Sequence, residues 1–180
     1  MNYIKSILVI IYHYMRGSYI DKSRKRGVRI GNDCRLNDYP RWGSEPWLVS
    51  LGNHVEISTH VTFLTHDGAT WCFRDKELYK NVIKYGKIQI FDNCFIGANT
   101  TILPGVDIGP NSIVGAASVV TKNVEPDSVY AGSPAKKICT LSEYAEKCLN
   151  QTPDYDKDAY NRDKKSEVLR VLNKSINNNV

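Results

Sequence analysis

Apolar residues recur with a period of six along residues 90–124, and this is the clearest pattern in the chain. An α-helix places apolar residues every three or four positions, and a strand with one buried face alternates every two. A strict period of six is instead typical of a coil in which each hexapeptide forms a short strand and a turn. The aliphatic members are Ile90, Ile96, Ile102, Ile108, Val114 and Val120, and the small residues four places later are Cys94, Thr100, Val106, Ser112, Ser118 and Val124. The pattern predicts an all-β solenoid of hexapeptide repeats.

The same apolar column continues toward the N-terminus, but two interruptions break its period. Its upstream members are Ile30, Leu36, Leu51, Ile57 and Phe63. The distances from Leu36 to Leu51 and from Phe63 to Ile90 are not multiples of six. Inserts in repeat proteins leave the stack as loops, often on the binding face. We therefore expect inserts near residues 37–47 and 67–86 within a repeat domain that spans residues 30–138.

The N-terminal segment, residues 1–29, precedes the repeats and contains the hydrophobic stretch Ile7–Tyr12. This stretch is too short to span a bilayer. We expect the segment to cap the open end of the solenoid, because terminal repeats need a cover. Together with Arg16 and Lys22–Arg26 it is also suited to peripheral contact with a membrane surface, so both interpretations stay open.

The C-terminal tail, residues 139–180, is polar and has the capping residues and apolar spacing expected of short helices. The capping box Thr140–Glu143 predicts a helix that continues to about Leu149. The polar residues 151–163 predict a loop, and the apolar stripe within residues 164–174 predicts a second helix.

Composition narrows the classes of partner. A length of 180 residues is enough for one domain with a buried core, and the formal net charge of +5 is too mild and too scattered to predict a nucleic-acid partner. Five cysteines, an odd number without any Cys-x-x-Cys pair, favour a reduced, cytoplasmic protein and disfavour a structural zinc site. Cys34 and Cys94 also fall at repeat positions that should be buried.

Three histidines, His54, His60 and His66, share one position of the repeat. In a three-sided coil, successive hexapeptides lie on different faces, so these rings should point away from one another rather than share a metal. We therefore expect no metal site and expect His54 and His60 to be exposed turn residues. His66 differs because the repeat stops there, next to Asp67 and the second insert. On these residues alone it is equally a turn residue or a general base.

Three segments, Ile96–Gly109, Val114–Lys122 and Tyr130–Lys136, resemble the hexapeptide-repeat acyltransferase superfamily, the left-handed parallel β-helix enzymes. Upstream, Gly43–Pro46 and Thr65–Gly68 resemble the branch that O-acetylates sugars in capsule or lipopolysaccharide synthesis. The likeness to the galactoside, maltose and xenobiotic acetyltransferases is more distant. The resemblance implies a cytoplasmic homotrimer that moves an acetyl group from acetyl-CoA, bound between neighbouring subunits, to a sugar or polysaccharide hydroxyl.

The resemblance also implies roles for individual residues. The family histidine corresponds to His66, which would take the proton of the attacking hydroxyl. Galactoside-type enzymes use an asparagine that has no clear match here, so Glu45 is the alternative polar partner. The implied cofactor-binding residues are Ala98, Ala116, Thr121, Lys122, Pro134 and Lys136, and the residues assigned to the acceptor are Glu45, Asp67, Trp71 and Arg74. Several relatives have an arginine where this chain has Cys139, which removes one implied cofactor contact.

Other functions remain open at this point. A non-sugar small molecule is an alternative acceptor, as in xenobiotic acetyltransferases. A zinc-dependent protein like the γ-class carbonic anhydrases would need histidines brought together across a subunit interface, and a third alternative is a scaffold without catalysis. Trp42, Trp47 and Trp71 offer rings that stack on a sugar face, but they are equally suited to packing the inserts onto the solenoid.

Overall fold

The computed structural model describes residues 19–177, with side chains as far as residue 173. The chain forms two compact units, the first ending at Ser142 and the second beginning at Glu143. The expected cap or membrane contact at Ile7–Tyr12 therefore lies outside the described residues. Within the described residues, every helix is too short or too polar to cross a membrane.

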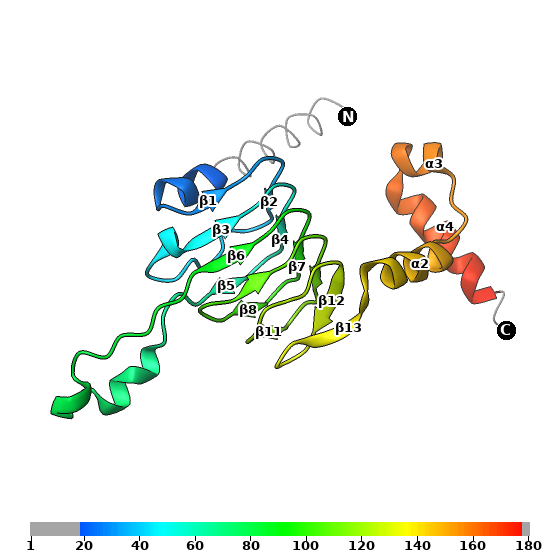
Figure 1. Ribbon diagram of the computed structural model, residues 1–180. Helices are drawn as coiled ribbons and strands as arrows, with labels where there is room; N and C mark the ends of the chain where they lie inside the picture. Colours follow the sequence, from blue (N-terminus) through cyan, green and yellow to red (C-terminus); the bar gives the residue numbers. More distant parts are fainter. Residues whose placement is uncertain (1–18, 178–180) are drawn as a thin grey trace. The chain divides into compact units, whose positions relative to one another are not determined.

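Short strands in the first unit form three sheets, which we name A, B and C and together call the β-stack (Figure 1). Sheet A contains β1 (Arg29–Ile30), β3 (Val49–Leu51), β6 (Ile88–Ile90) and β9 (Asp107–Ile108). Sheet B contains β2 (Arg35–Leu36), β4 (Glu56–Ile57), β7 (Phe95–Ile96), β10 (Ile113–Val114), β12 (Ser128–Ala131) and β13 (Lys136–Thr140). Sheet C contains β5 (Thr62–Phe63), β8 (Thr101–Ile102) and β11 (Val119–Val120).

The pairing follows the period of six that the sequence shows. Phe95 pairs with Ile113, and Thr101 pairs with Val119, so neighbouring strands lie three hexapeptides apart. Consecutive strands from β6 to β11 belong to sheets A, B and C in turn. The resulting pairs, β6 with β9, β7 with β10 and β8 with β11, are all parallel. The predicted parallel sheets of hexapeptide repeats are thus confirmed. An antiparallel pair, β12 with β13, ends sheet B.

Corner residues with positive φ let the chain turn between sheets. Those between sheets A and B are Asp33, His54, Asn93, Asn111 and Asp127. Asn and Asp visit this left-handed region at lower cost than other residues with a side chain. Their side chains form a ladder across successive coils, in which His54 Nδ1 lies 2.8 Å from Asn93 Oδ1 and Asn111 donates to Asp127. His60 also has positive φ, and both histidines are exposed, as expected of turn residues.

The aliphatic column fills the inside of the β-stack, and its members from Leu36 to Val120 are buried. Trp42 joins this column, where its ring stacks on Phe63 with centroids 4.7 Å apart and its Nε1 donates to Ser23 Oγ. Arg41 makes a parallel bridge to Thr62 in sheet C, so this segment occupies a repeat position six residues after Leu36. The structure thereby narrows the first insert to the residues after Trp42, which include the 3₁₀ helix η1 (Pro46–Leu48).

A helical segment, residues 19–25, packs next to the first coil (Figure 1). Tyr19 and Ile20 contact the core, and the fully buried Ser23 accepts the hydrogen bond from Trp42. These contacts cover apolar side chains at the first coil of the described residues.

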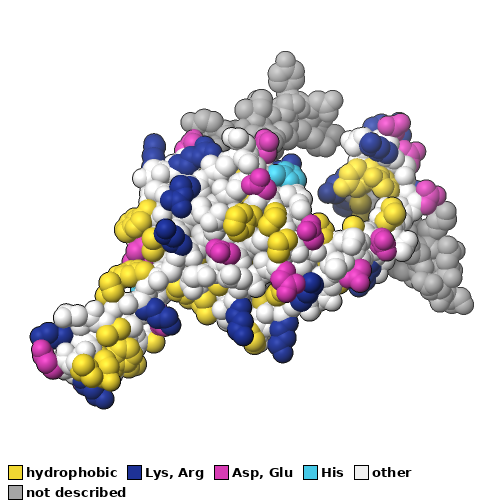
Figure 2. All heavy atoms as spheres, in the orientation of Figure 1, with side chains coloured by type: hydrophobic (Ala, Val, Ile, Leu, Met, Phe, Trp, Pro, Cys, Tyr) yellow, Lys and Arg dark blue, Asp and Glu magenta, His cyan; other side chains and the backbone are white. Residues whose placement is uncertain are grey.

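The second insert, residues 67–86, projects from the β-stack as an arm (Figure 1). Main-chain contacts close its base: His66 bridges Tyr85, and the N–H of Asp67 donates to the carbonyl of Lys84. Beyond them lie two 3₁₀ helices, η2 (Gly68–Phe73) and η3 (Glu77–Tyr79). Apolar side chains gather on the surface of the arm (Figure 2), and its exposed large residues include Trp71, Leu78 and Ile83.

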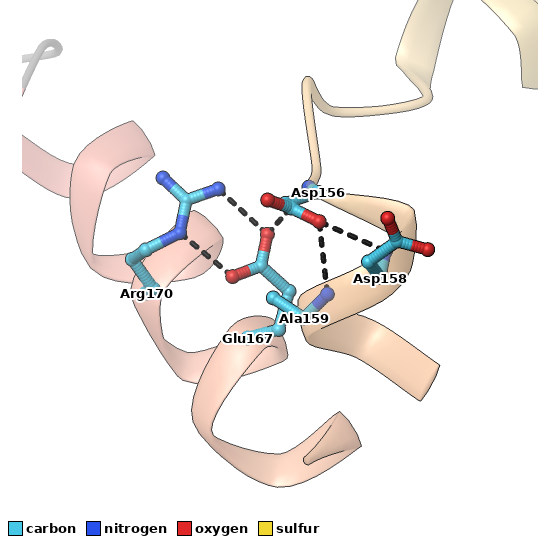
Figure 3. A network of polar contacts seen from close by, with 5 residues as sticks. All are labelled: Asp156, Asp158, Ala159, Glu167 and Arg170. Carbon is cyan, nitrogen blue, oxygen red and sulfur yellow. Dashed lines mark hydrogen bonds and ion pairs between the residues drawn. The ribbon is translucent and has the colours of Figure 1, made fainter. Parts of the chain in front are cut away.

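The helices after the repeats are α2 (Leu141–Gln151), α3 (Lys157–Arg162) and α4 (Lys164–Asn177). The two predicted helices are confirmed, but the loop predicted over residues 151–163 is wrong, because α3 forms within it. Asp156 caps α3 by accepting hydrogen bonds from the N–H groups of Asp158 and Ala159 (Figure 3). Glu167 of α4 links both helices, since it accepts from the Asp156 N–H and from Arg170. Hydrogen bonds from Arg170 lower the pKa of Glu167 to about 2.

Candidate active site

His66, Glu45 and Thr65 form a hydrogen-bonded group at the edge of sheet C. His66 Nδ1 lies 3.0 Å from Glu45 Oε2, and Thr65 Oγ1 donates to the same oxygen over 2.6 Å. The Glu45 side chain is only 15% exposed, whereas that of His66 is 42% exposed. The carboxylate is therefore held inside the group, and the imidazole opens to solvent.

The local sequence explains why these three side chains meet. Thr65 and His66 follow β5 after Leu64, so the pairing of this strand with β8 sets their position. Glu45 arrives from the other side, on the turn that follows Gly43. Gly43 has a φ of +72°, and a Cβ placed on it would lie 2.6 Å from Thr65 Oγ1. A glycine here lets the turn approach Thr65 closely enough for Glu45 to reach both partners.

Glu45 is well suited to orient His66. Partial burial raises the pKa of its carboxyl, but the hydrogen bonds from Thr65 and His66 outweigh this, and the pKa is lowered overall. The ionised carboxylate only accepts hydrogen bonds, so Nδ1 of His66 carries the proton that they share. The lone pair of the neutral ring is then on Nε2, which is the atom available to accept a proton.

A groove of about 590 Å³ runs past His66. Parallel pairing stacks the residues that follow β5, β8 and β11 at one edge of sheet C, so side chains distant in sequence line the same groove. Its lining residues are Gly43, Ser44, Leu64, Thr65, His66, Asp67, Gly68, Lys84, Leu103, Pro104 and Thr121. The structure thus brings together His66, Asp67 and Thr121 from the residues expected in the site, with Glu45 behind the imidazole.

Asp67 and Lys84 form an ion pair beside the imidazole. Lys84 Nζ lies 2.8 Å from Asp67 Oδ2, and Ala69 N–H donates to Asp67 Oδ1. The hydrogen bond from Lys84 is the main reason that the pKa of Asp67 is lowered. The Tyr85 ring lies 5.9 Å from that of His66, centroid to centroid. Sequence reasoning missed Lys84 and Tyr85, because only the return of the arm to its base brings them to His66.

The residues expected to bind cofactor lie at two ends of sheet C. Ala98 and Ala116 stack on successive coils before β8 and β11, where Ala117 N–H donates to the Ala98 carbonyl. Thr121 and Lys122 follow β11 at the opposite end, and both are exposed. Pro134 follows a cis peptide bond and is exposed, as is Lys136 on β13. One chain therefore provides the first four of these residues at opposite ends of the strands of sheet C and the last two near sheet B.

The remaining acceptor candidates lie on the arm. Trp71 is 81% exposed, so its ring is available to a ligand, whereas Trp42 is only 1% exposed and packs in the core. Arg74 lines a smaller cavity that also touches His66, and its Nε donates to the Val82 carbonyl. Trp47, the middle residue of η1, is exposed.

The histidines that share a repeat position take different partners. His54 contacts Asn93, His60 lies 3.7 Å from Asp38, and His66 contacts Glu45. Among the described residues, no group of three or more His, Cys, Asp or Glu side chains is arranged to hold a metal ion.

Comparison with known proteins gives this arrangement a context. Residues 87–122 match the family model described as bacterial transferase hexapeptide (six repeats). Protein CapG of Staphylococcus aureus is 47% identical over 151 residues, which cover 83% of this chain and 86% of that protein. The chain belongs to the hexapeptide-repeat acyltransferase superfamily. The resemblance expected from the sequence motifs is confirmed, and membership places this chain among the acyl-CoA-dependent transferases.

Other superfamily members match shorter parts of the chain. Galactoside O-acetyltransferase of Escherichia coli K12 is 37% identical over 100 residues, which cover 55% of this chain and 47% of that enzyme. A hexapeptide-repeat acetyltransferase from Vibrio cholerae has the same fold, with a TM-score of 0.55, 22% identity, and 70% and 81% of the two chains covered. AntD, an N-acyltransferase from Bacillus cereus solved with dTDP-4-amino-4,6-dideoxyglucose and coenzyme A, gives a TM-score of 0.53, 23% identity, and coverage of 69% and 72%.

Proposed function

We propose that this superfamily member transfers an acetyl group from acetyl-CoA to a sugar hydroxyl, with His66 as general base and Glu45 as its positioning residue. The observation that carries the proposal is the contact of His66 Nδ1 with Glu45 at the edge of an open groove. A free hydroxyl is a weak nucleophile at neutral pH, so a correctly oriented base is the group that the reaction needs most.

In this mechanism Nε2 of His66 accepts the proton of the acceptor hydroxyl as that oxygen attacks the thioester carbonyl. The new carbon–oxygen bond forms and the carbon–sulfur bond breaks, so the products are the acetyl ester and CoA. The imidazolium then returns its proton to the departing sulfur, which restores neutral His66. Glu45 stabilises the transient positive charge on the ring, because its lowered pKa keeps it ionised.

The cofactor would lie along sheet C. Small side chains at Ala98 and Ala116 allow close approach to the main chain at one end of the strands, and Thr121 and Lys122 are exposed at the other end. Pro134 and Lys136 would meet the phosphorylated end, since an exposed ammonium attracts phosphate. The alanines and the Thr121–Lys122 pair lie at opposite ends of the strands of sheet C, and a groove between neighbours of a homotrimer would combine one end from each subunit. Such a trimer, built from left-handed β-helices, is part of the proposal.

The relatives support a sugar as acceptor. A galactoside O-acetyltransferase is among them, and the AntD structure contains a nucleotide-linked sugar. The similarity to protein CapG supports a role in capsule synthesis, with lipopolysaccharide synthesis as a related setting. The proposed location is the cytoplasm, including the inner face of the membrane for a lipid-linked acceptor, because the proposed reaction uses acetyl-CoA.

The direct test is transfer of labelled acetate from acetyl-CoA to sugar acceptors by the purified protein. We expect a labelled ester that mild base removes, together with one CoA thiol released per ester. Label that resists mild base would indicate an amide and contradict transfer to a hydroxyl. Light scattering on the same sample should give a mass near three chains, and full activity in a stable monomer would contradict the shared groove.

A further inference from the structure

A second cavity of about 160 Å³ lies beside the proposed general base, on the side of the arm. His66, Asp67, Arg74 and Lys84 are among its lining residues. Lys84 also lines the larger groove, as do His66 and Asp67. A ligand whose hydroxyl reaches His66 from the groove is therefore within reach of both cations.

Hydrogen bonds to main-chain carbonyls position the two cationic residues. The Asp67 N–H donates to the carbonyl of Lys84, which places Lys84 opposite Asp67 and one residue before Tyr85, the bridge partner of His66. Arg74 is held to the arm's other segment, where its Nε donates to the Val82 carbonyl. Contacts at the base of the arm therefore place Lys84, and the Val82 carbonyl holds the Arg74 guanidinium.

The cavity has an excess of positive charge. Arg74 and Lys84 bring two positive charges to its lining, and Asp67 brings one negative charge. Asp67 accepts from the Ala69 N–H on Oδ1 and from Lys84 on Oδ2, so each of its oxygens already has a donor. The Lys84 ammonium keeps further N–H donors, and the Nη groups of a guanidinium suit a planar or tetrahedral oxyanion. Such donors favour an anion over a neutral hydroxyl.

We propose that the acceptor sugar carries an anionic group, a carboxylate or a phosphate, which Arg74 and Lys84 bind while the hydroxyl reaches His66. This inference rests on the proposed function and specifies its substrate class. Asp67 acts as the positioning residue that keeps Lys84 at the mouth of the cavity in the absence of acceptor.

The test compares matched acceptors: methyl glucoside, methyl glucuronoside and glucose 1-phosphate, with the corresponding galactose set. We expect kcat/KM to favour an anionic acceptor by about 10-fold, since each partly exposed charge contact contributes a few-fold. The larger of the carboxylate and phosphate ratios identifies the anion. Lys84→Gln and Arg74→Gln should each lower the ratio of anionic to neutral acceptor by about 3-fold or more, and salt should lower it in the wild type.

Lys80→Gln is the matched control. Lys80 is on the same arm and pairs with Glu77 over 2.6 Å, but neither of these two cavities includes it, so the ratio should stay at the wild-type value. Equal use of neutral and anionic sugars by the wild type, or an unchanged ratio in both Arg74→Gln and Lys84→Gln, would overturn this inference while leaving acetyl transfer intact. Absence of transfer to every sugar would contradict the proposed function and remove this inference with it.

Discussion

The β-stack and the arm differ in how far their large apolar residues are exposed to solvent. In the β-stack the aliphatic column and Trp42 are buried, whereas Trp71, Leu78 and Ile83 of the arm are exposed. Core burial contributes to stability in proportion to the apolar area removed from water. The arm depends instead on main-chain contacts at its base and on ion pairs such as Lys84 with Asp67. The comparison suggests that the β-stack carries stability and that the arm is free to carry ligand contacts.

The two tryptophans provide the largest expected contrast. Trp42→Ala should lower the free energy of unfolding by about 3–5 kcal/mol, because it empties a core position and removes the donor to Ser23. Trp71→Ala should change the melting temperature little but lower kcat/KM for the acceptor by about 3- to 10-fold, if the ring stacks on sugar. Thermal melts and kinetics on both variants check this. A large loss of stability in Trp71→Ala with normal kinetics would reverse the contrast.

Glu45→Gln tests whether the first insert, like the arm, contributes to activity rather than to stability. We expect kcat to fall by about 10- to 100-fold, since a hydrogen bond to a charged group contributes roughly 1.5–3 kcal/mol. The melting temperature should change much less than in Trp42→Ala. Glu56→Gln is the control, because Glu56 contacts Asn37 and Arg35 on the outside of sheet B. Equal kcat in Glu45→Gln and wild type would mean that His66 needs no carboxylate.

Lys122 and Lys136 should show smaller effects. Each substitution by Ala should raise KM for acetyl-CoA severalfold, because an exposed ion pair contributes about 0.2–1 kcal/mol. Salt should weaken binding in the wild type more than in the double variant. Lys137→Ala is the control, since Lys137 pairs with Glu125 over 2.7 Å. The same salt dependence in wild type and double variant would place both lysines outside the cofactor site.

Acid should lower the stability of the helical unit through Glu167, whereas no such effect is expected at neutral pH. The folded pKa of Glu167 is about 2, below the ordinary 4.5, so its contribution is present above pH 4.5 and is lost as pH falls toward 2. Protection of α3 amides against hydrogen exchange, relative to the intrinsic rate at each pH, should therefore fall over this interval. Glu167→Gln should exchange faster at neutral pH and show a flatter response to acid. An identical acid response in wild type and Glu167→Gln would contradict this role of the Arg170 and Asp156 contacts.

The repeats were the most predictable part of the chain, because aliphatic residues at a strict period of six report the inside of the coil directly. Trp42 was assigned to the first insert, because only aliphatic residues and Phe63 marked the column in the sequence. Helix α3 was missed because its residues carry no apolar stripe, and the capping residue Asp156 was its only signal. Lys84 could not be assigned to the site, because its position depends on which residues pair at the base of the arm.

The His66→Ala variant tests the central claim most directly. His66 is exposed and outside the core, so folding and acetyl-CoA affinity should stay near wild type. We expect kcat for acetyl transfer to fall by about 10²- to 10⁴-fold, the usual range for loss of a general base. Steady-state kinetics on the folded variant measure this fall. A kcat above about one tenth of the wild-type value would contradict the assignment of His66 as the general base.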